Sequence, residues 1–256
     1  MPLAAQYLVN PCLNATFKSA TFCDVTKGID ERSADIVKRL TIIEKIDALG
    51  TGTGPLPSVG LPAYNWWSEA THGISHVRDG PGSSTPDETN FALPITTGGA
   101  FNRTMWALTG HAIGVEARAF MNAGNAYSTY WAPVINLVRD PRWGRNIETP
   151  GEDPYLSGEY AINFVKGFQE HPEAPGEVMA SACCKHYVAN SMDGSTVDGH
   201  TATRVDFDAV ITEQDLVDSY LAPFQACVEQ GDVTSLMCSY NSVSRLKAYS
   251  FLRALA

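Results

Sequence analysis

Three short apolar runs alternate with longer amphipathic segments along this chain of 256 residues. The runs cover residues 131–138, 178–184 and 234–238, and within them apolar and polar residues do not clearly alternate. This pattern is typical of strands that are buried on both faces, as in a parallel sheet. When such strands alternate with helices, right-handed crossovers join them. The sequence therefore predicts an α/β fold.

Four segments have the apolar spacing and the end signals of helices. We expect Ser33 to cap the first of them and Gly50 to end it. The second and third are expected over residues 102–122 and 157–169. The fourth is expected to begin after Thr212, the first residue of the capping sequence Thr-Glu-Gln-Asp.

The composition limits the classes of partner. A net charge of −10 and a pI near 5.0 argue against nucleic acid, which requires a basic surface. No run of eighteen apolar residues occurs, so no membrane span is expected. A neutral or weakly charged small molecule fits this composition better.

Several features favour an exported parent protein, although the first ten residues lack the basic and apolar parts of a signal peptide. Cys12 and Cys23 lie in a segment rich in Pro, Asn and Thr. Asn14-Ala-Thr16 and Asn102-Arg-Thr104 match the acceptor sequence for N-glycosylation. The remaining cysteines lie in apolar segments and are expected to be buried thiols: Cys183, Cys184, Cys227 and Cys238.

Two dense polar segments, residues 140–154 and 183–187, follow apolar runs. The carboxyl ends of strands open onto the active face of a barrel or doubly wound sheet, so side chains there meet ligands. Lys185 and His186 together can bind a polyol, or they can be an incidental charged strand end.

Arg145 lies in the first of these polar segments. Its planar guanidinium can hold vicinal hydroxyls or a carboxylate. The alternative is a structural salt bridge with Glu148, Glu152 or Asp153.

Trp66 and Trp67 precede Glu69 and His72, a combination of stacking surface, carboxylate and imidazole that suits a sugar site. The alternative is a tryptophan pair buried in the core. His72 and His76 have helical metal-ligand spacing, but Gly73 between them and the lack of a Glu after His72 argue against zinc.

No Gly-rich phosphate-binding sequence and no Gly-x-Ser-x-Gly sequence occurs. Nucleotide binding is therefore not supported, and a serine hydrolase would have no visible nucleophile. With zinc at the histidine pair argued against as well, we predict no metal site and no cofactor.

The order of the motifs along the chain is more specific than any one of them. They are Tyr64-Asn-Trp-Trp-Ser-Glu-Ala-Thr-His-Gly73, Asp140-Pro-Arg-Trp-Gly-Arg-Asn-Ile-Glu-Thr-Pro-Gly-Glu-Asp-Pro154, Cys183-Cys-Lys-His-Tyr-Val188 and Met237-Cys-Ser-Tyr-Asn241. This succession resembles glycoside hydrolase family 3, and most of all its eukaryotic β-xylosidases, over roughly residues 20–243.

The resemblance implies an incomplete (β/α)8 TIM-type barrel, the N-terminal domain of that family. We expect a lead segment at residues 1–32, a partial barrel at 33–243 and a divergent, helix-prone tail at 244–256.

The resemblance also implies an O-glycosyl hydrolase of xylan catabolism, a retaining exo-acting enzyme that removes terminal β-linked xylose from xylo-oligosaccharides. Glu69 in its Trp-Trp-x-Glu-Ala-x-His-Gly setting favours xylose. The residues that the resemblance assigns to the sugar are Arg145, Lys185 and His186 on its hydroxyls, Trp67 and Glu69 capping it, and Met237 and Tyr240 on the floor.

The sequence departs from the family pattern after Val243. The family's nucleophile, an Asp in a later Ser-Asp motif, and its acid/base segment have no counterpart in these residues, so a truncated or mis-spliced gene is expected and no catalytic residue is assigned. The chain itself is expected to be inactive, and its full-length parent to carry a second α/β domain and to be secreted. Alternatives are a β-glucosidase of the same family and a non-catalytic sugar-binding remnant.

Overall fold

The structure is a computed structural model that describes residues 10–75, 88–197 and 199–247. The chain divides into two compact units. The first unit comprises residues 1–67, 77–83 and 119–127, and the second comprises residues 68–76, 84–118 and 128–256. The domain boundaries predicted at residues 32 and 243 stay predictions.

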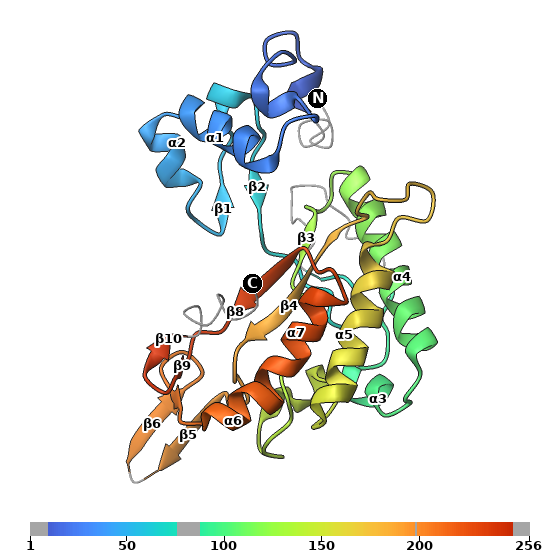
Figure 1. Cartoon of the computed structure of the whole chain (residues 1–256), viewed down its shortest axis with the longest axis vertical. Coiled ribbons are helices and arrows are strands. Elements are labelled where there is room, and N and C mark those ends of the chain that lie inside the picture. Colours follow the sequence, from blue (N-terminus) through green and yellow to red (C-terminus); the bar gives the residue numbers. More distant parts are fainter. Residues whose placement is uncertain (1–9, 76–87, 198, 248–256) are drawn as a thin grey trace. The chain divides into compact units, whose positions relative to one another are not determined.

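The first unit is built from short helices and a two-stranded antiparallel ribbon (Figure 1). Its elements are 3₁₀ helices at Pro11–Leu13, Thr21–Cys23 and Pro57–Val59, helices α1 (Ile29–Arg39) and α2 (Ile42–Asp47), and strands β1 (Gly52–Thr53) and β2 (Tyr64–Asn65). Phe22 and Val59 lie in its small apolar core. A disulfide joins Cys12 to Cys23. Covalent closure of this kind suits a segment that buries little apolar surface.

The helix predicted from Ser33 to Gly50 is two helices. The first begins earlier, after Gly28, and ends at Arg39, while Ser33 lies inside it. Thr41 then opens α2 with a capping box, in which its hydroxyl accepts from the Glu44 N–H and the Glu44 carboxylate accepts from the Thr41 N–H. A reciprocal cap satisfies backbone groups at a new helix start, so the apolar stripe continues across a break in the backbone.

The second unit holds most of the chain (Figure 1). Its helices are α3 (Pro94–Gly98), α4 (Arg103–Asn122, whose last residues are counted with the first unit), the 3₁₀ helix Gly144–Glu148, α5 (Pro154–Gln169), α6 (Glu213–Asp215), the π-helical turn Leu216–Leu221 and α7 (Ala222–Glu229). Its strands are β3 (Thr129–Tyr130), β4 (Ser181–Tyr187), β5 (Gly194–Val197), β6 (His200–Thr203), β7 (Asp208–Ala209), β8 (Ser235–Cys238), β9 (Ser242–Val243) and β10 (Leu246–Lys247).

Three of the four predicted helices are confirmed in their positions. The second matches α4 closely, and the third begins at Pro154 with Asp153 as its cap, a few residues before the expected start. Thr212 caps the fourth as predicted, but a π-helical turn interrupts that helix before Pro223. Proline lacks the N–H that a regular helix needs at this position, which accounts for the irregular turn.

A parallel sheet in the order β3-β4-β8 forms the centre of the second unit. Helix α5 connects β3 to β4 and α7 precedes β8, and both helices pack against β4 and against each other (Figure 1). The predicted α/β fold with parallel strands is thus confirmed as an incomplete (β/α) barrel. The run at 131–138 is not a regular strand. Pro133 has no N–H to donate, and only Val134 forms an isolated bridge, to Lys185.

Glycines let α4 and α5 approach closely. A Cβ atom at Gly110 would lie 2.3 Å from the backbone oxygen of Phe164, and one at Gly167 would lie 2.1 Å from that of Ala107. A larger residue at either position would force the two helices apart.

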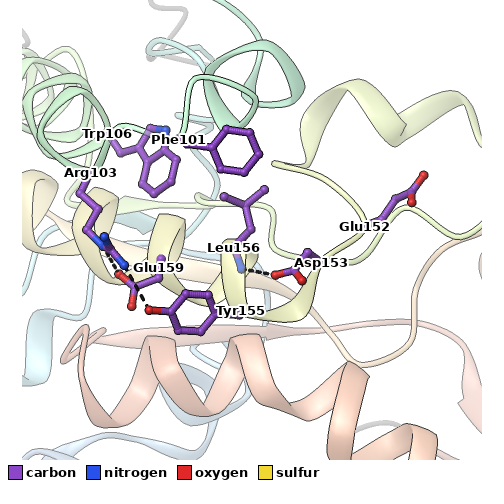
Figure 2. Close-up of a pocket in the computed structure, with 8 residues that line it drawn as sticks. All are labelled: Phe101, Arg103, Trp106, Glu152, Asp153, Tyr155, Leu156 and Glu159. Carbon is purple, nitrogen blue, oxygen red and sulfur yellow. Dashed lines mark hydrogen bonds and ion pairs between the residues drawn. The ribbon is translucent and has the colours of Figure 1, made fainter.

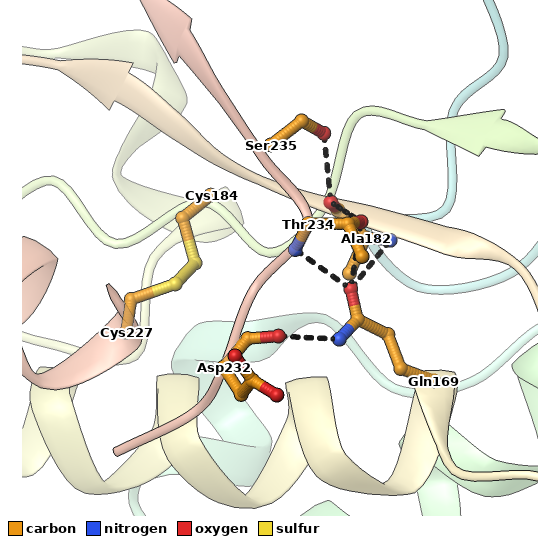
Figure 3. Close-up of a disulfide and its surroundings, with 7 residues drawn as sticks. All are labelled: Gln169, Ala182, Cys184, Cys227, Asp232, Thr234 and Ser235. Carbon is orange, nitrogen blue, oxygen red and sulfur yellow. Dashed lines mark hydrogen bonds between the residues drawn. A yellow bond between two sulfur atoms is a disulfide. The ribbon is translucent and has the colours of Figure 1, made fainter. Parts of the chain in front are cut away.

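A glutamine and a disulfide tie the helices to β4 (Figure 3). The Gln169 amide oxygen, at the end of α5, accepts from the backbone N–H groups of Ala182 and Thr234, and its amide nitrogen donates to the Asp232 carbonyl. Cys184 on β4 forms a disulfide with Cys227 on α7. The strand that carries Lys185 and His186 is therefore fixed from the helical side.

The prediction that four cysteines are free thiols is wrong for two of them. Cys184 and Cys227 are bonded, whereas Cys183 and Cys238 are free. Successive strand residues point to opposite faces, so Cys184 can reach α7 while Cys183 cannot. The described part of the tail that was expected to be helix-prone also differs, because Leu246–Lys247 pairs as β10 with β9.

Among the described residues, no helix combines the length and the apolar character needed to cross a bilayer.

Candidate functional site

A cavity of about 380 Å³ in the second unit brings together three of the predicted site residues. Glu69 comes from the segment after the first unit, Arg145 from the 3₁₀ helix Gly144–Glu148, and Lys185 from β4. Strand β4 lies between β3 and β8 in a parallel sheet. The carboxyl ends of parallel strands lie at the same edge, so the carboxyl end of β4 lies near the loops that follow the other two strands. The structure therefore brings these three residues together, and their role in sugar binding stays a prediction.

Lys185 is the most buried charged residue of this cavity, with a side chain only 2% exposed. Its ammonium group donates a short, charge-assisted hydrogen bond to a carboxylate oxygen of Glu69. Burial lowers the pKa of Lys185, and the Glu69 carboxylate opposes that shift. The pair places a cationic donor and a carboxylate acceptor side by side. A hydroxyl group can accept a hydrogen bond from the first and donate one to the second.

Arg145 forms a two-point ion pair with Glu148. Its Nε lies 2.8 Å from one carboxylate oxygen and a terminal nitrogen lies 2.6 Å from the other. Of the three salt-bridge partners considered from the sequence, Glu148 is the one observed. Both residues also line the cavity, so the ion pair orients the guanidinium there.

His186 is buried and its orientation is set by Asn136. The Asn136 amide oxygen accepts from the His186 backbone N–H at 2.8 Å, and the amide nitrogen donates to the His186 carbonyl at 2.8 Å. These bonds fix which end of the amide is oxygen. The same oxygen lies 3.1 Å from the ring Nδ1, so Nδ1 must carry the hydrogen.

The protonation state of His186 follows from its surroundings. Burial and, to a smaller extent, the charges of Lys185 and Arg145 hold its pKa well below 6.5. The ring is therefore neutral, and because Nδ1 carries the hydrogen, Nε2 is a hydrogen-bond acceptor.

Three further predicted site residues, Trp67, Met237 and Tyr240, are not among those that line the cavity. Met237 lies on β8 in parallel register with Lys185, and Tyr240 follows the end of that strand with an exposed side chain. Trp67 is the last residue of the first unit and is described with that unit. The alternative of a buried tryptophan pair is wrong, since Trp66 and Trp67 are 47% and 39% exposed.

Two residues to which the resemblance assigns no role also belong to this arrangement, and the sequence marks the first of them, His72, as part of its motif. His72 lines the cavity, and its Nδ1 is buried with no hydrogen-bond partner among the described residues. Its position in the Trp-Trp-x-Glu-Ala-x-His motif was the available signal. Asn136 lies in an apolar run, and nothing in the sequence marks it.

No group of three or more His, Cys, Asp or Glu side chains that could hold a metal ion occurs in the part of the chain that the structure describes. His76, the second member of the histidine pair considered from the sequence, lies outside the described residues.

The cavity is lined by donors and acceptors rather than by a continuous apolar surface. Lys185 and Arg145 supply fixed cationic donors, and Glu69 and Glu148 supply acceptors. His186 follows Lys185 on β4 but is not among the residues that line this cavity. Neutral molecules with several hydroxyl groups match this mixture, because each hydroxyl both donates and accepts.

The chain is similar to curated relatives over most of its length. The chain is 45% identical over 236 residues to "Beta-xylosidase/alpha-L-arabinofuranosidase 1" of Medicago sativa subsp. varia, which covers 90% of this chain and 30% of the relative. It is 40% identical over 241 residues to a probable exo-1,4-β-xylosidase of Aspergillus terreus, covering 91% of this chain and 30% of the relative. The chain thus spans less than a third of the length of these curated relatives.

Solved structures agree with the sequence comparison. A GH3 exo-β-xylosidase in complex with a xylobiose aziridine probe superposes with a TM-score of 0.82 at 29% identity, covering 97% of this chain and 32% of that one. β-Glucosidase 3B from Thermotoga neapolitana gives a TM-score of 0.64 at 30% identity, covering 77% and 25%. The family description "Glycosyl hydrolase family 3 N terminal domain" matches residues 74–250. This chain belongs to glycosyl hydrolase family 3 and carries its N-terminal barrel domain in part.

Proposed function

We propose that this chain is the sugar-binding part of a retaining, exo-acting β-xylosidase that removes terminal β-linked xylose from xylo-oligosaccharides. The cavity in which the Lys185–Glu69 and Arg145–Glu148 pairs meet carries the proposal, because it offers fixed donors and acceptors for neighbouring hydroxyls. The names of the relatives support xylose as the sugar.

In this proposal each predicted site residue has a role. Arg145, Lys185 and His186 bind hydroxyls of the terminal sugar, with His186 accepting through Nε2. Trp67 and Glu69 cap that sugar, whereas Met237 and Tyr240 line the floor below it. His72, with a buried nitrogen that has no partner among the described residues, adds one further polar contact.

The second candidate is a β-glucosidase of the same family. The likeness to the Thermotoga β-glucosidase favours it, although with a lower TM-score than the likeness to the exo-β-xylosidase. A glucose ring carries a hydroxymethyl group that xylose lacks, so relative activity on the two sugars discriminates between the two candidates. A third reading, a sugar-binding remnant without catalysis, agrees with the lack of an assigned nucleophile in these residues.

We also propose export of the whole protein and a second α/β domain in it. The Cys12–Cys23 and Cys184–Cys227 disulfides support export, because such bonds persist in oxidising compartments. The share of each relative that the chain covers supports a further domain.

A chimera tests the proposed activity. Residues 20–243 replace the matching segment of the Medicago relative, and kcat/KM is measured on aryl β-xyloside, β-glucoside and α-L-arabinofuranoside. We expect the β-xyloside to be the best substrate. Preference for the β-glucoside would replace the proposal by the second candidate. A folded chimera without activity, together with a transcript that shows no Ser-Asp motif after the codon for Val243, would favour the remnant.

The same chimera tests the role of Asn136. In Asn136→Asp a carboxylate would lie about 3 Å from Nδ1 of His186, and such a charge raises a histidine pKa by about 1–3 units. Protonation of His186 removes its acceptor, so the acid limb of the kcat/KM profile should move to higher pH. Asn163→Asp, on the partly exposed side of α5, is the matched control. An acid limb shared by both variants would argue against this role.

A further inference from the structure

An exposed four-residue segment, Phe101-Asn-Arg-Thr104, opens helix α4. The Asn102 amide oxygen caps the helix by accepting from the Met105 N–H at 3.0 Å. The amide nitrogen of Asn102 makes no hydrogen bond within the described residues. That nitrogen is the atom to which an N-linked glycan is attached, and Thr104 completes the acceptor sequence.

A pocket of about 560 Å³ lies directly beside this segment (Figure 2). Phe101 and Trp106 form one side of it, and Tyr155 and Leu156 at the beginning of α5 form the other (Figure 2). Both neighbours of Asn102, Phe101 and Arg103, line the pocket. Its volume lies within the range of about 300–1,000 Å³ that small ligands occupy.

The residue that precedes Asn102 is strained and exposed. Phe101 has a φ of +49° and is 75% exposed. A bulky residue in the left-handed region is an outlier with strained backbone geometry. Tyr155 across the pocket is also 69% exposed. Two large rings thus stay in solvent, one of them at a conformational cost, which points to a ligand that covers them.

The polar groups of the pocket are held in place. Arg103 donates through Nε to the Glu159 carboxylate at 2.5 Å, and a terminal nitrogen donates to the Tyr155 hydroxyl at 3.1 Å. Aromatic faces beside oriented carboxylate and hydroxyl groups suit a pyranose ring, whose C–H face stacks while its hydroxyl and acetamido groups bond. The pocket therefore matches the first sugars of a glycan on Asn102.

We propose that Asn102 carries an N-linked glycan whose first N-acetylglucosamine units pack against Phe101 in this pocket. The donor is a lipid-diphosphate-linked oligosaccharide of the secretory pathway. The Asn102 amide nitrogen forms a bond to the anomeric carbon, the bond from that carbon to the diphosphate oxygen breaks, and the amide loses one proton. The proposal rests on the export proposed above.

Attachment is tested by secretory expression of the chain in eukaryotic cells behind an added signal peptide. Peptide mass spectrometry should find a glycan on the peptide that contains Asn102, and Asn102→Gln should abolish it. Because occupancy is read on digested peptides, an unstable variant does not obscure the result. An unmodified Asn102 would overturn the proposal. Hydrolase activity is not measured, so failure of the proposed β-xylosidase function gives a separate result.

Packing is tested by the rate at which an endoglycosidase releases the Asn102 glycan without denaturant. Phe101→Ala keeps the acceptor sequence and should speed release about two- to tenfold, as expected from loss of one aromatic stacking contact. The difference should vanish in urea. Leu13→Ala, which truncates another exposed apolar side chain beside the acceptor Asn14, is the control and should not change release from Asn102. Equal rates for Phe101→Ala and the unaltered chain would overturn packing in the pocket.

Discussion

A polypeptide of residues 1–256 should hydrolyse p-nitrophenyl β-xyloside no faster than buffer does. Retaining hydrolysis needs two carboxyl groups about 5–5.5 Å apart, one to attack and one to donate a proton. The motifs assign neither group to these residues. Glu69 and Glu148, two carboxylates of the cavity, are already ion-paired with Lys185 and Arg145. In these ion pairs both carboxylates accept hydrogen bonds from cations, an arrangement that suits sugar binding.

The chimera with the Medicago relative supplies the comparison for this prediction. Enzymes turn over at about 1–1,000 per second and accelerate their reactions by about a millionfold or more, so the difference between chimera and polypeptide should be of that size. Both proteins are assayed at equal concentration after removal of aggregates. Turnover in the ordinary enzyme range by residues 1–256 alone would mean that the cavity contains a nucleophile that the motifs do not reveal.

The fold could be predicted where the signal is local and repeated. An apolar run predicts each of the strands β4 and β8, because a strand buried on both faces carries apolar residues on both. An amphipathic segment predicts α4, because a helix buried along one stripe has its apolar residues at helical spacing. The break between α1 and α2 after Arg39 could not be predicted from the apolar pattern, because the apolar stripe continues across it. The local feature that marks the break is the cap that Thr41 forms at the start of α2. The Cys184–Cys227 bond joins residues 43 apart, and pairing over such a separation depends on the packing of α7 against β4.

Contacts in the site that join residues far apart in the sequence could likewise not be predicted from local patterns. Lys185 and Glu69 are 116 residues apart, and their meeting was expected only because the order of the motifs resembles a known family. Asn136 illustrates the limit. Its three hydrogen bonds to His186 depend on how the irregular segment after β3 runs beside β4, and an asparagine in an apolar run gives no hint of this.

Lys185→Ala in the chimera should lower kcat/KM by about 30- to 1,000-fold, which corresponds to about 2–4 kcal/mol for a charged donor in a site that excludes water. The side chain is almost fully buried and contacts Glu69, so its loss removes a donor to the sugar and leaves that carboxylate without its cation. If the contact strengthens in the transition state, kcat should fall together with kcat/KM, whereas a rise in KM alone would indicate ground-state binding.

Two further variants separate sugar binding from simple loss of the ion pair. Lys166→Ala removes an exposed lysine of α5 and should leave both constants unchanged. Glu69→Gln removes the partner charge but keeps an acceptor, and a double-mutant cycle with Lys185→Ala measures the coupling of the pair. If the Lys185 ammonium binds the sugar directly, the single variant Lys185→Ala should lose more activity than Glu69→Gln. Wild-type activity of Lys185→Ala would remove Lys185 from the proposed site, and equal losses in both single variants and the double variant would reduce its role to holding Glu69.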